Sequence, residues 1–214
     1  MRIALIGYGK MGHTIEQVAQ ERGHVIVFRG DVGWSVDQLP DADVAIEFTT
    51  PQTAEENVCK LLDRHLPVVS GTTGWNIEAM QRKSQDSGIG FLWASNFSLG
   101  VNLFFALNER LTELMHGYDY QPSITEIHHI HKLDKPSGTA KTLAAAIGEN
   151  VPVESVREGE VAGIHIVRWD SPADTITITH EAKSRQGFAL GAVLAAEWLK
   201  DKQGPHTMAE VLRL

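Results

Sequence analysis

Three histidines, a lysine and an aspartate crowd into nine residues of this chain, where the sequence reads EIHHIHKLD over 126–134. A histidine titrates near neutral pH and can donate or accept a proton. A lysine places a point charge beside a carboxylate and can also act as an acid. The segment is therefore a proton-transfer site, a metal site or an ordinary polar strand end.

Metal binding is the interpretation with the weakest support. His128, His129 and His131 could each offer a ring nitrogen, but there is no H-E-x-x-H helix and no well-spaced carboxylate to complete a ligand set. The single cysteine, Cys59, excludes zinc sites built on paired cysteines and any disulfide framework within the chain. We therefore expect no metal at this segment.

The next residues, Ser137, Gly138 and Thr139, open a predicted helix over 139–147. Serine and threonine are good N-caps, and the first amides of a helix have no partner within it. A carboxylate docked there would gain those amides and the positive end of the helix dipole. The segment is either a carboxylate-binding site or a plain helix cap.

The second chemically suggestive segment is GYGKMG, residues 7–12, which follows a short apolar run and opens a helical pattern. In that context Gly7 permits a tight turn, Gly9 lets the backbone approach a pyrophosphate, and Gly12 allows close packing of helix on strand. The segment predicts dinucleotide binding.

The choice of dinucleotide stays open at the end of the second predicted strand, VIVFRGD. An acid is expected there, about 20 residues after the glycine-rich turn, to accept hydrogen bonds from ribose hydroxyls. Asp31 can fill this role, while Arg29 can face a 2′-phosphate or be a solvated surface charge. NADH is favoured, and NADPH is possible.

The secondary-structure elements that must position these residues follow one pattern up to residue 97 and another after it. Up to residue 97, apolar runs alternate with helical stretches, which is typical of a doubly wound parallel sheet. The runs lie at 2–7, 24–28, 43–48, 67–71 and 90–94. Two further segments, GTT at 71–73 and ASNF at 94–97, lie just past predicted strand ends, at the edge where open α/β sheets bind ligands.

After residue 97 the pattern predicts a separate α+β unit with a mixed or antiparallel sheet. Its predicted elements are a helix at 100–115 and strands at 123–129, 161–169 and 175–182, besides the helix at 139–147. The fold class is therefore α/β, a Rossmann-type parallel sheet domain plus a smaller α+β domain. We place a dinucleotide-binding domain at 1–97 with a return segment at 187–214, and a substrate-binding and oligomerisation domain at 98–186.

Composition limits the classes of function. The chain has 214 residues and a net charge of −8, which argues against a nucleic-acid surface. No apolar run approaches the ~18 residues of a membrane span. A first strand that starts at residue 2 leaves no room for a signal peptide, so a soluble cytoplasmic protein is expected.

Taken with a nucleotide-binding domain, the segment EIHHIHKLDKPSGTA resembles the signature of the 4-hydroxy-tetrahydrodipicolinate (dihydrodipicolinate) reductase family. The shared pattern is His-His-x-x-Lys-x-Asp-x-Pro-Ser-Gly-Thr-Ala, with Lys135 at a position that is often alanine. SGTTGW, SNFSLGVN and SRQGFALGAVLAAEWL agree with the family in the same order. The chain is shorter than the family pattern between the second and third strands, where the adenosine-binding loop lies.

The resemblance implies NAD(P)H-dependent reduction of 4-hydroxy-2,3,4,5-tetrahydrodipicolinate in lysine and diaminopimelate biosynthesis. It implies His128 and Lys132 as catalytic residues, without deciding which delivers the proton, and His129, Ser137, Gly138 and Thr139 as substrate contacts. It implies contacts to NADH or NADPH by Gly7, Tyr8, Gly9, Lys10, Met11, Gly12, Asp31, Gly71, Thr72, Thr73, Ala94, Ser95, Asn96 and Phe97.

Family members form tetramers, so we expect a homotetramer, with the Thr/Ile strand at 175–180 as a candidate contact. Arg185 is a second carboxylate partner or a loop arginine, and His165 is a lone strand histidine with a structural role. Two other functions remain open. One is another small NAD(P)-dependent dehydrogenase of an imine or carbonyl acid, and the other is a nucleotide-sensing module without turnover.

Overall fold

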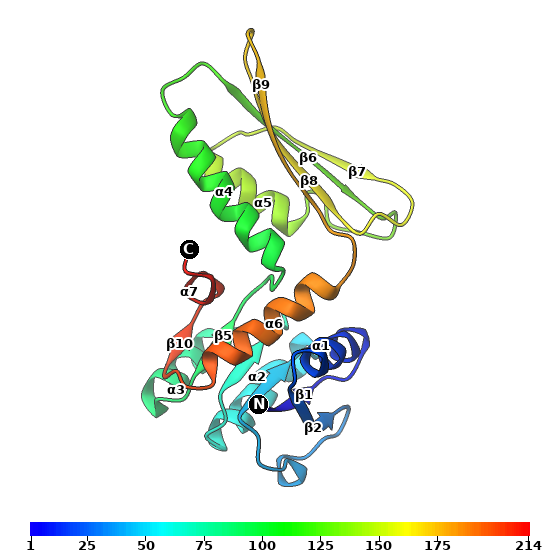
Figure 1. Ribbon diagram of the computed structural model, residues 1–214, viewed down its shortest axis with the longest axis vertical. Coiled ribbons are helices and arrows are strands. Elements are labelled where there is room, and N and C mark those ends of the chain that lie inside the picture. The colour runs from blue at the N-terminus through cyan, green and yellow to red at the C-terminus, as the bar shows by residue number, and fades with distance from the viewer. The chain divides into compact units, whose positions relative to one another are not determined.

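A computed structural model describes residues 1–214 and divides the chain into two compact units (Figure 1). The first unit comprises Met1–Leu99 and Arg185–Leu214, and the second comprises Gly100–Ser184. The chain therefore leaves the first unit once and returns to it. The sequence-based range for the inserted domain, 98–186, differs from this division by two residues at each end.

The first unit is built on a six-stranded parallel sheet with the strand order β10-β5-β4-β3-β1-β2. Its central strands are buried along almost their whole length, as expected of apolar runs covered on both faces. The predicted doubly wound parallel sheet is confirmed. The strands are β1 (Arg2–Ile6), β2 (Val25–Gly30), β3 (Val44–Glu47), β4 (Val68–Ser70), β5 (Phe91–Trp93) and β10 (Pro205–His206).

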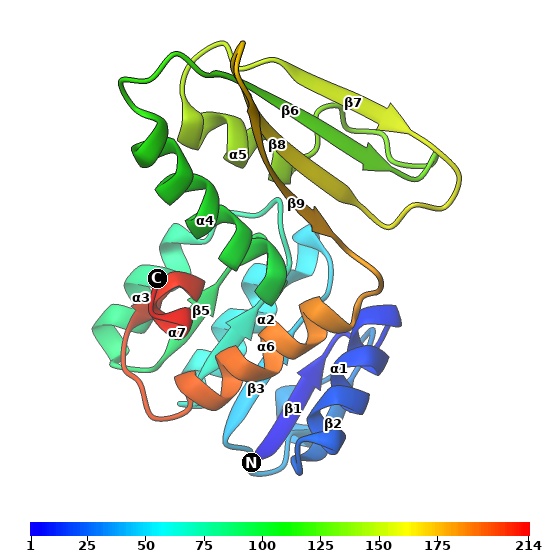
Figure 2. The same cartoon turned by 45° about the horizontal axis from the view of Figure 1, so that its top comes forward.

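Helices cover both faces of this sheet (Figure 2). One face packs against α1 (Lys10–Glu21), α6 (Gln186–Leu199) and α7 (Met208–Leu212), and the other against α2 (Pro51–Asp63) and α3 (Glu78–Ser87). The return of α6 to the first unit depends on close contact, because a Cβ at Gly191 would lie 1.7 Å from the carbonyl oxygen of Phe97.

The second unit has a four-stranded mixed sheet with the order β7-β6-β8-β9. Strand β6 (Gln121–His128) pairs in parallel with β7 (Val153–Arg157) and antiparallel with β8 (Ile164–Asp170), which pairs antiparallel with β9 (Thr175–Glu181). The predicted mixed sheet is confirmed, but β7 was missed. Its sequence, VESVR, is short and half polar, so it carries no strand signal of its own.

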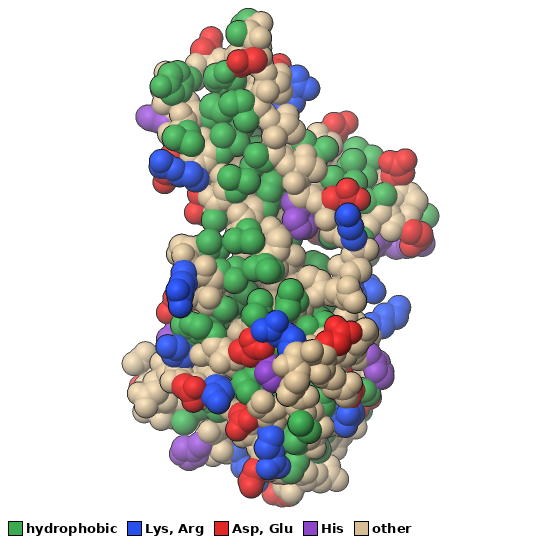
Figure 3. Space-filling view, viewed as in Figure 1, with side chains coloured by type: hydrophobic (Ala, Val, Ile, Leu, Met, Phe, Trp, Pro, Cys, Tyr) green, Lys and Arg blue, Asp and Glu red, His purple; other side chains and the backbone are tan.

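Two helices, α4 (Leu99–Met115) and α5 (Gly138–Ile147), pack on one face of this sheet. The helix α4 buries Phe104 and Met115 but exposes Leu103, Leu107 and Leu114, and hydrophobic side chains gather over it in Figure 3. It is therefore apolar on both faces. None of the helices combines the length and the apolar character that a bilayer span requires.

Candidate active site and cofactor pocket

The glycine-rich turn has the geometry that its sequence predicts. Gly7 has φ +93°, and a Cβ there would lie 2.0 Å from the carbonyl oxygen of Phe48. A Cβ at Gly12 would lie 2.5 Å from the carbonyl oxygen of Gly7. Gly9 is the N-cap of α1, and a Cβ there would meet nothing within 4 Å. Two glycines therefore serve packing, and the third leaves open space beside the first amides of a helix.

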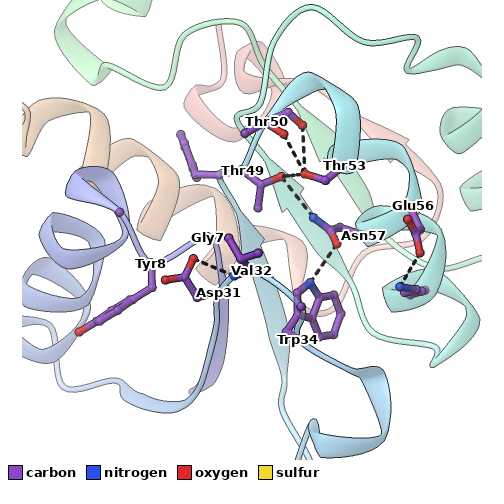
Figure 4. A pocket seen from close by; sticks show the side chains of 14 residues that line it. Gly7, Tyr8, Asp31, Val32, Trp34, Thr49, Thr50, Thr53, Glu56 and Asn57 are labelled. Atoms are coloured by element: carbon purple, nitrogen blue, oxygen red, sulfur yellow. Dashed lines mark hydrogen bonds and ion pairs between the residues drawn. The ribbon is translucent and has the colours of Figure 1, made fainter.

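Two pockets in the first unit border this turn. A pocket of about 460 Å³ lies between the turn, the loop after β2 and the start of α2 (Figure 4), and includes the predicted cofactor contacts Gly7, Tyr8, Gly9 and Asp31. A second pocket of about 300 Å³ is lined by Met11, Phe48, Thr49, Pro51, Gly71, Thr72 and Thr73. Phe48 and Thr49 line both pockets. Eight of the predicted cofactor contacts thus line the two pockets.

The remaining predicted contacts line neither pocket. Lys10 begins α1, and Gly12 lies buried beneath the turn. The segment 94–97 follows β5, and its last residue, Phe97, is 2% exposed in the core with its ring 5.7 Å from that of Phe48. The side chain of Phe97 therefore serves packing, and only its backbone can meet a ligand.

Arg29 is paired with an acid of α1 and lines neither of these two pockets. Its Nε lies 3.1 Å from Glu16 Oε2, a second nitrogen bonds the other Glu16 oxygen, and the guanidinium lies 5.8 Å from the centre of the Tyr8 ring. The Tyr8 hydroxyl also donates to Glu16. The hydrogen bonds from Arg29 hold the pKa of Glu16 below its usual value. Asp31, by contrast, presents its carboxylate at the pocket (Figure 4).

An aromatic wall of the larger pocket was not singled out from the sequence. The Nε1 of Trp34 donates to Asn57 Oδ1 at 2.9 Å, and Asn57 donates to Thr49 Oγ1 at 3.2 Å (Figure 4). Lys60 Nζ lies 5.9 Å from the centre of the Trp34 ring. These residues come from the β2–β3 connection, the β3–α2 connection and α2, so only the folded chain brings them together. A fixed indole at a pocket wall can stack on a planar base.

Glu47 is a second residue that the sequence did not single out. It is fully buried at the end of β3, and its carboxylate accepts hydrogen bonds from the Thr49 amide at 2.9 Å, Ser70 Oγ at 2.5 Å and Thr72 Oγ1 at 2.8 Å. Glu47 thereby ties together the segments that follow β3 and β4, both of which line the pockets. An acid that ends an otherwise apolar strand, VAIE, was the available signal.

In the second unit, the segment EIHHIHKLD, residues 126–134, folds as the end of a strand and a loop. Strand β6 ends at His128, and Glu126 and His128 point to the same face because they are two residues apart. The His128 Nδ1 bonds to Glu126 Oε2, and Arg157 donates to Glu126 Oε1 at 2.9 Å. Burial lowers the pKa of His128, although Glu126 opposes the shift. Burial also opposes ionisation of Glu126, but hydrogen bonds from Arg157, Ser155 and His128 hold its pKa below the usual value.

Lys132 lies in the loop that follows β6. Its Nζ is 2.7 Å from Asp134 Oδ1, and this hydrogen bond lowers the pKa of Asp134. Arg157 donates to the carbonyl oxygens of Lys132 at 3.2 Å and Asp134 at 2.5 Å. His131 is exposed and bonds to Glu160 at 3.2 Å. Residues that lie close together in the sequence therefore have different settings: His128 is buried, Lys132 lies on a loop and His131 is at the surface.

His165 lies on strand β8 as predicted, but the prediction that it is a lone histidine is wrong. Its ring lies 5.1 Å from that of His128, and its Nε2 lies 3.1 Å from Ser137 Oγ. Burial lowers the pKa of His165 to about 4, so the ring is neutral near pH 7. The antiparallel pairing of β8 with β6 brings it there, which the sequence around Ile164 and Ile166 does not indicate.

The N-terminus of α5 has the predicted cap. Ser137 Oγ accepts a hydrogen bond from the Ala140 amide at 3.2 Å, while a Cβ at Gly138 would meet nothing within 4 Å. The amides of Gly138 and Thr139 belong to the first turn, where no intrahelical acceptor exists. The start of α5 therefore combines open space at Gly138 with two backbone amides, those of Gly138 and Thr139, that can donate hydrogen bonds to a ligand.

Glu126, His128 and His165 offer ligand atoms that all lie within 4.8 Å of one another. The two oxygens of Glu126 are already used by His128 and by Arg157, whose positive charge opposes a cation nearby. Glu126 and His128 form a hydrogen-bonded network with Arg157, and we propose no metal site in this cluster.

The fold and the glycine-rich turn define a two-domain protein with a Rossmann-type nucleotide-binding domain. Residues 1–97 match the family described as dihydrodipicolinate reductase, N-terminus, and residues 100–212 match the family described as dihydrodipicolinate reductase, C-terminus. The chain belongs to the dihydrodipicolinate reductase family.

Similar proteins cover the whole chain. The 4-hydroxy-tetrahydrodipicolinate reductase of Christiangramia forsetii is 48% identical, covering 99% of this chain and 98% of its own. The enzyme of the same name from Archaeoglobus fulgidus is 33% identical, covering 99% and 100%. The fold matches a dipicolinate-bound dihydrodipicolinate reductase from Paenisporosarcina sp. TG-14 with a TM-score of 0.78 at 22% identity, over 98% of both chains.

Proposed function

We propose that this protein reduces 4-hydroxy-2,3,4,5-tetrahydrodipicolinate to 2,3,4,5-tetrahydrodipicolinate with a nicotinamide cofactor, a step of lysine and diaminopimelate biosynthesis. The observation that carries the proposal is the 48% identity to a reductase of this name across nearly the whole of both chains. The site geometry supports it, because the second unit offers a histidine, a lysine and an open helix N-terminus on neighbouring segments.

The proposed catalytic residues are His128 and Lys132. The cofactor, when bound, supplies the hydride. The protein must supply a proton to the neighbouring carbon and hold two carboxylates. With Nδ1 of His128 engaged by Glu126, Nε2 is the ring nitrogen left to exchange a proton. Lys132 presents a charged ammonium group on the adjoining loop and can serve as the second donor.

The proposed substrate contacts are His129, Ser137, Gly138 and Thr139. The amides of Gly138 and Thr139, together with the positive end of the α5 dipole, suit one carboxylate of a dicarboxylate substrate. No side chain fills the space at Gly138, so the carboxylate can approach the backbone. Ser137 contributes as the cap that orients this turn, since its hydroxyl is buried and already bonded.

The proposed cofactor preference is NADH over NADPH. The Asp31 carboxylate at the larger pocket can accept hydrogen bonds from ribose hydroxyls and would repel a 2′-phosphate. Arg29, the residue that could compensate, is paired with Glu16. The Gly9 space suits the pyrophosphate, and the Trp34 ring suits the adenine.

We also propose a homotetramer assembled through the sheet of the second unit. Both helices of that unit pack on one face of the sheet, which Figures 1 and 2 show. The opposite face carries Ile127, Ile164 and Ile166, which alternate with residues whose side chains point toward the helices. An apolar sheet face of this kind suits contact with a second copy.

The direct test is NADH oxidation by the purified protein, with substrate generated in situ from pyruvate and aspartate semialdehyde. We expect turnover that depends on both precursors and is inhibited by pyridine-2,6-dicarboxylate. A protein that binds NADH but shows no turnover under these conditions would instead be a nucleotide-sensing module.

A further inference from the structure

Glu126 is a fully buried acid whose two carboxylate oxygens have different partners. One oxygen bonds to the His128 Nδ1, and the other lies 2.9 Å from an Arg157 nitrogen. Burying a carboxylate away from water costs several kcal/mol of free energy unless charged and hydrogen-bonded partners compensate. Here Arg157, itself only 8% exposed at the side chain, provides the compensating charge. The proposed reaction gives this buried ion pair no direct contact with substrate or cofactor.

Arg157 extends the same connection to the loop that carries Lys132. Its Nε donates to the Lys132 carbonyl at 3.2 Å, and the nitrogen that binds Glu126 also donates to the Asp134 carbonyl at 2.5 Å. The planar guanidinium fixes several donors in one rigid fork. Thus one ion pair holds the imidazole of one proposed catalytic residue and the backbone of the other.

We propose that Glu126 and Arg157 are positioning residues for the reduction, Glu126 by holding His128 in the Nδ1–H form and Arg157 by holding the Lys132 loop. In that form Nε2 is bare and can take up a proton, and the imidazolium that results can deliver a proton from Nε2. This inference rests on the proposed function, because it assigns roles relative to His128 and Lys132.

The surroundings of His128 agree with a ring held in one orientation. A Cβ at Gly163 would lie 3.0 Å from His128 Nε2, so glycine lets the backbone pack against that edge of the ring. His165 meets the ring edge-on from β8. Burial and the positive charges of Lys132 and Arg157 disfavour the imidazolium form of His128 and lower its pKa, and Glu126 opposes this shift.

Glu126→Gln tests the first role, because glutamine keeps the size of the side chain and removes its charge. We expect kcat to fall on the order of 10- to 100-fold, with the KM for substrate and the Kd for NADH within about twofold of wild type. The limb of the kcat/KM profile that follows the pKa of His128 should move to lower pH, because the imidazolium loses its stabilising partner. Glu126→Asp restores the charge and should return the limb toward its wild-type position.

Arg157→Lys tests the second role, because lysine keeps the charge beside Glu126 and loses the fork that reaches the loop carbonyls. We expect kcat to fall roughly tenfold, with the limb that follows the pKa of His128 unmoved. The two variants should therefore differ in their pH profiles. If both reduce activity and melting temperature alike with unchanged pH profiles, the pair serves stability alone and the proposal is wrong.

A measurement on the wild-type protein remains decisive even if neither variant folds. Nitrogen-15 NMR of histidine-labelled full-length protein, with the His128 resonance assigned from its loss in His128→Asn, should show Nδ1 protonated and Nε2 bare at pH 8 without substrate. An Nε2–H form would overturn the proposal. A wild-type protein with the expected tautomer but no reductase turnover would contradict the proposed function and leave the Glu126–His128 geometry standing.

Discussion

The two proposed catalytic side chains each lie beside a carboxylate, but their settings differ. His128 is 8% exposed, and its partner Glu126 is fully buried. Lys132 lies on a loop, and its partner Asp134 is about half exposed. Interactions between charges are much stronger where water is excluded. The histidine is therefore tuned by fixed neighbours, whereas the lysine can leave Asp134 for a substrate carboxylate at little cost.

His128→Ala and Lys132→Ala should each lower kcat by roughly 10²- to 10⁴-fold, the range for loss of a general acid. The Kd for NADH, measured by fluorescence titration, should stay at the wild-type value, since the cofactor pockets lie in the first unit. His131→Ala is the matched control, because this histidine belongs to the same segment and is exposed. Near-normal turnover in both alanine variants would refute the catalytic assignment.

Glu16→Gln should weaken the hold on Arg29 and make that guanidinium available to a 2′-phosphate. Wild type should prefer NADH, and the variant should raise kcat/KM for NADPH relative to NADH by roughly tenfold, about the effect of one charge-assisted hydrogen bond. Steady-state kinetics with both cofactors measure this ratio. Glu21→Gln, an exposed change on the same helix, should leave it unchanged. A strong wild-type preference for NADPH would mean that Asp31 does not contact the ribose.

At the scale of elements, the sequence predicted features that depend on neighbouring residues, but it did not predict the pairing of distant strands. The apolar strands, the glycine-rich turn and the Ser137 cap depend on neighbouring residues, so their patterns are visible in the chain. The partners of His128 depend on strand pairing. The register of β6 with β7 sets His128 opposite Arg157, and β7 has no strand signal of its own. The sequence therefore predicted the candidate catalytic residues but not the groups that orient them.

The α5 N-terminus offers a sharp test of carboxylate binding. Gly138→Val should weaken inhibition by pyridine-2,6-dicarboxylate and raise the KM for substrate, each by at least roughly tenfold, because the side chain occupies the space that the carboxylate needs. The protein itself should accept the change, since a Cβ there meets no neighbour within 4 Å. Ala145→Val, an exposed change on the same helix, is the control. Unchanged inhibition in Gly138→Val would show that Ser-Gly-Thr is only a cap.

At the scale of the whole molecule, the chain completes its first unit only when α6 returns from the inserted unit. Glu197 of α6 binds the segment between α1 and β2: it accepts two hydrogen bonds from Arg22 at 2.8 Å and lies 2.7 Å from His24 Nε2. The Arg22 hydrogen bonds hold the pKa of Glu197 below its usual value. An acid whose pKa is lower in the folded state than in the unfolded state stabilises the fold at pH values above its unfolded-state pKa. This stabilisation is lost as the pH falls through its folded-state pKa.

Glu197→Gln should therefore lower the free energy of unfolding at pH 7 by about 1 kcal/mol, a melting-temperature decrease of about 2–4 °C. The difference from wild type should shrink below pH 4.5, the ordinary pKa of this carboxyl, and vanish once Glu197 is protonated in both states. Thermal unfolding followed from pH 7 to pH 3 measures this. A difference that is the same at every pH would mean that the substituted side chain disturbs packing rather than charge.

Assembly is the last property that the fold constrains. The Thr/Ile alternation of β9 is that of a half-exposed strand, as predicted, but the apolar residues of the open sheet face lie on β6 and β8. Ile166 lies between Thr125 and Thr179 in the register of the sheet, away from its edges.

Light scattering should give the mass of four copies of the 23.6-kDa chain for wild type. Ile166→Lys should yield smaller species, because burying an unpaired ammonium group in a contact is costly. Tyr118→Lys, an equally drastic change in the turn after α4, should leave the tetramer intact. A tetramer that persists in Ile166→Lys would place the contact on another surface.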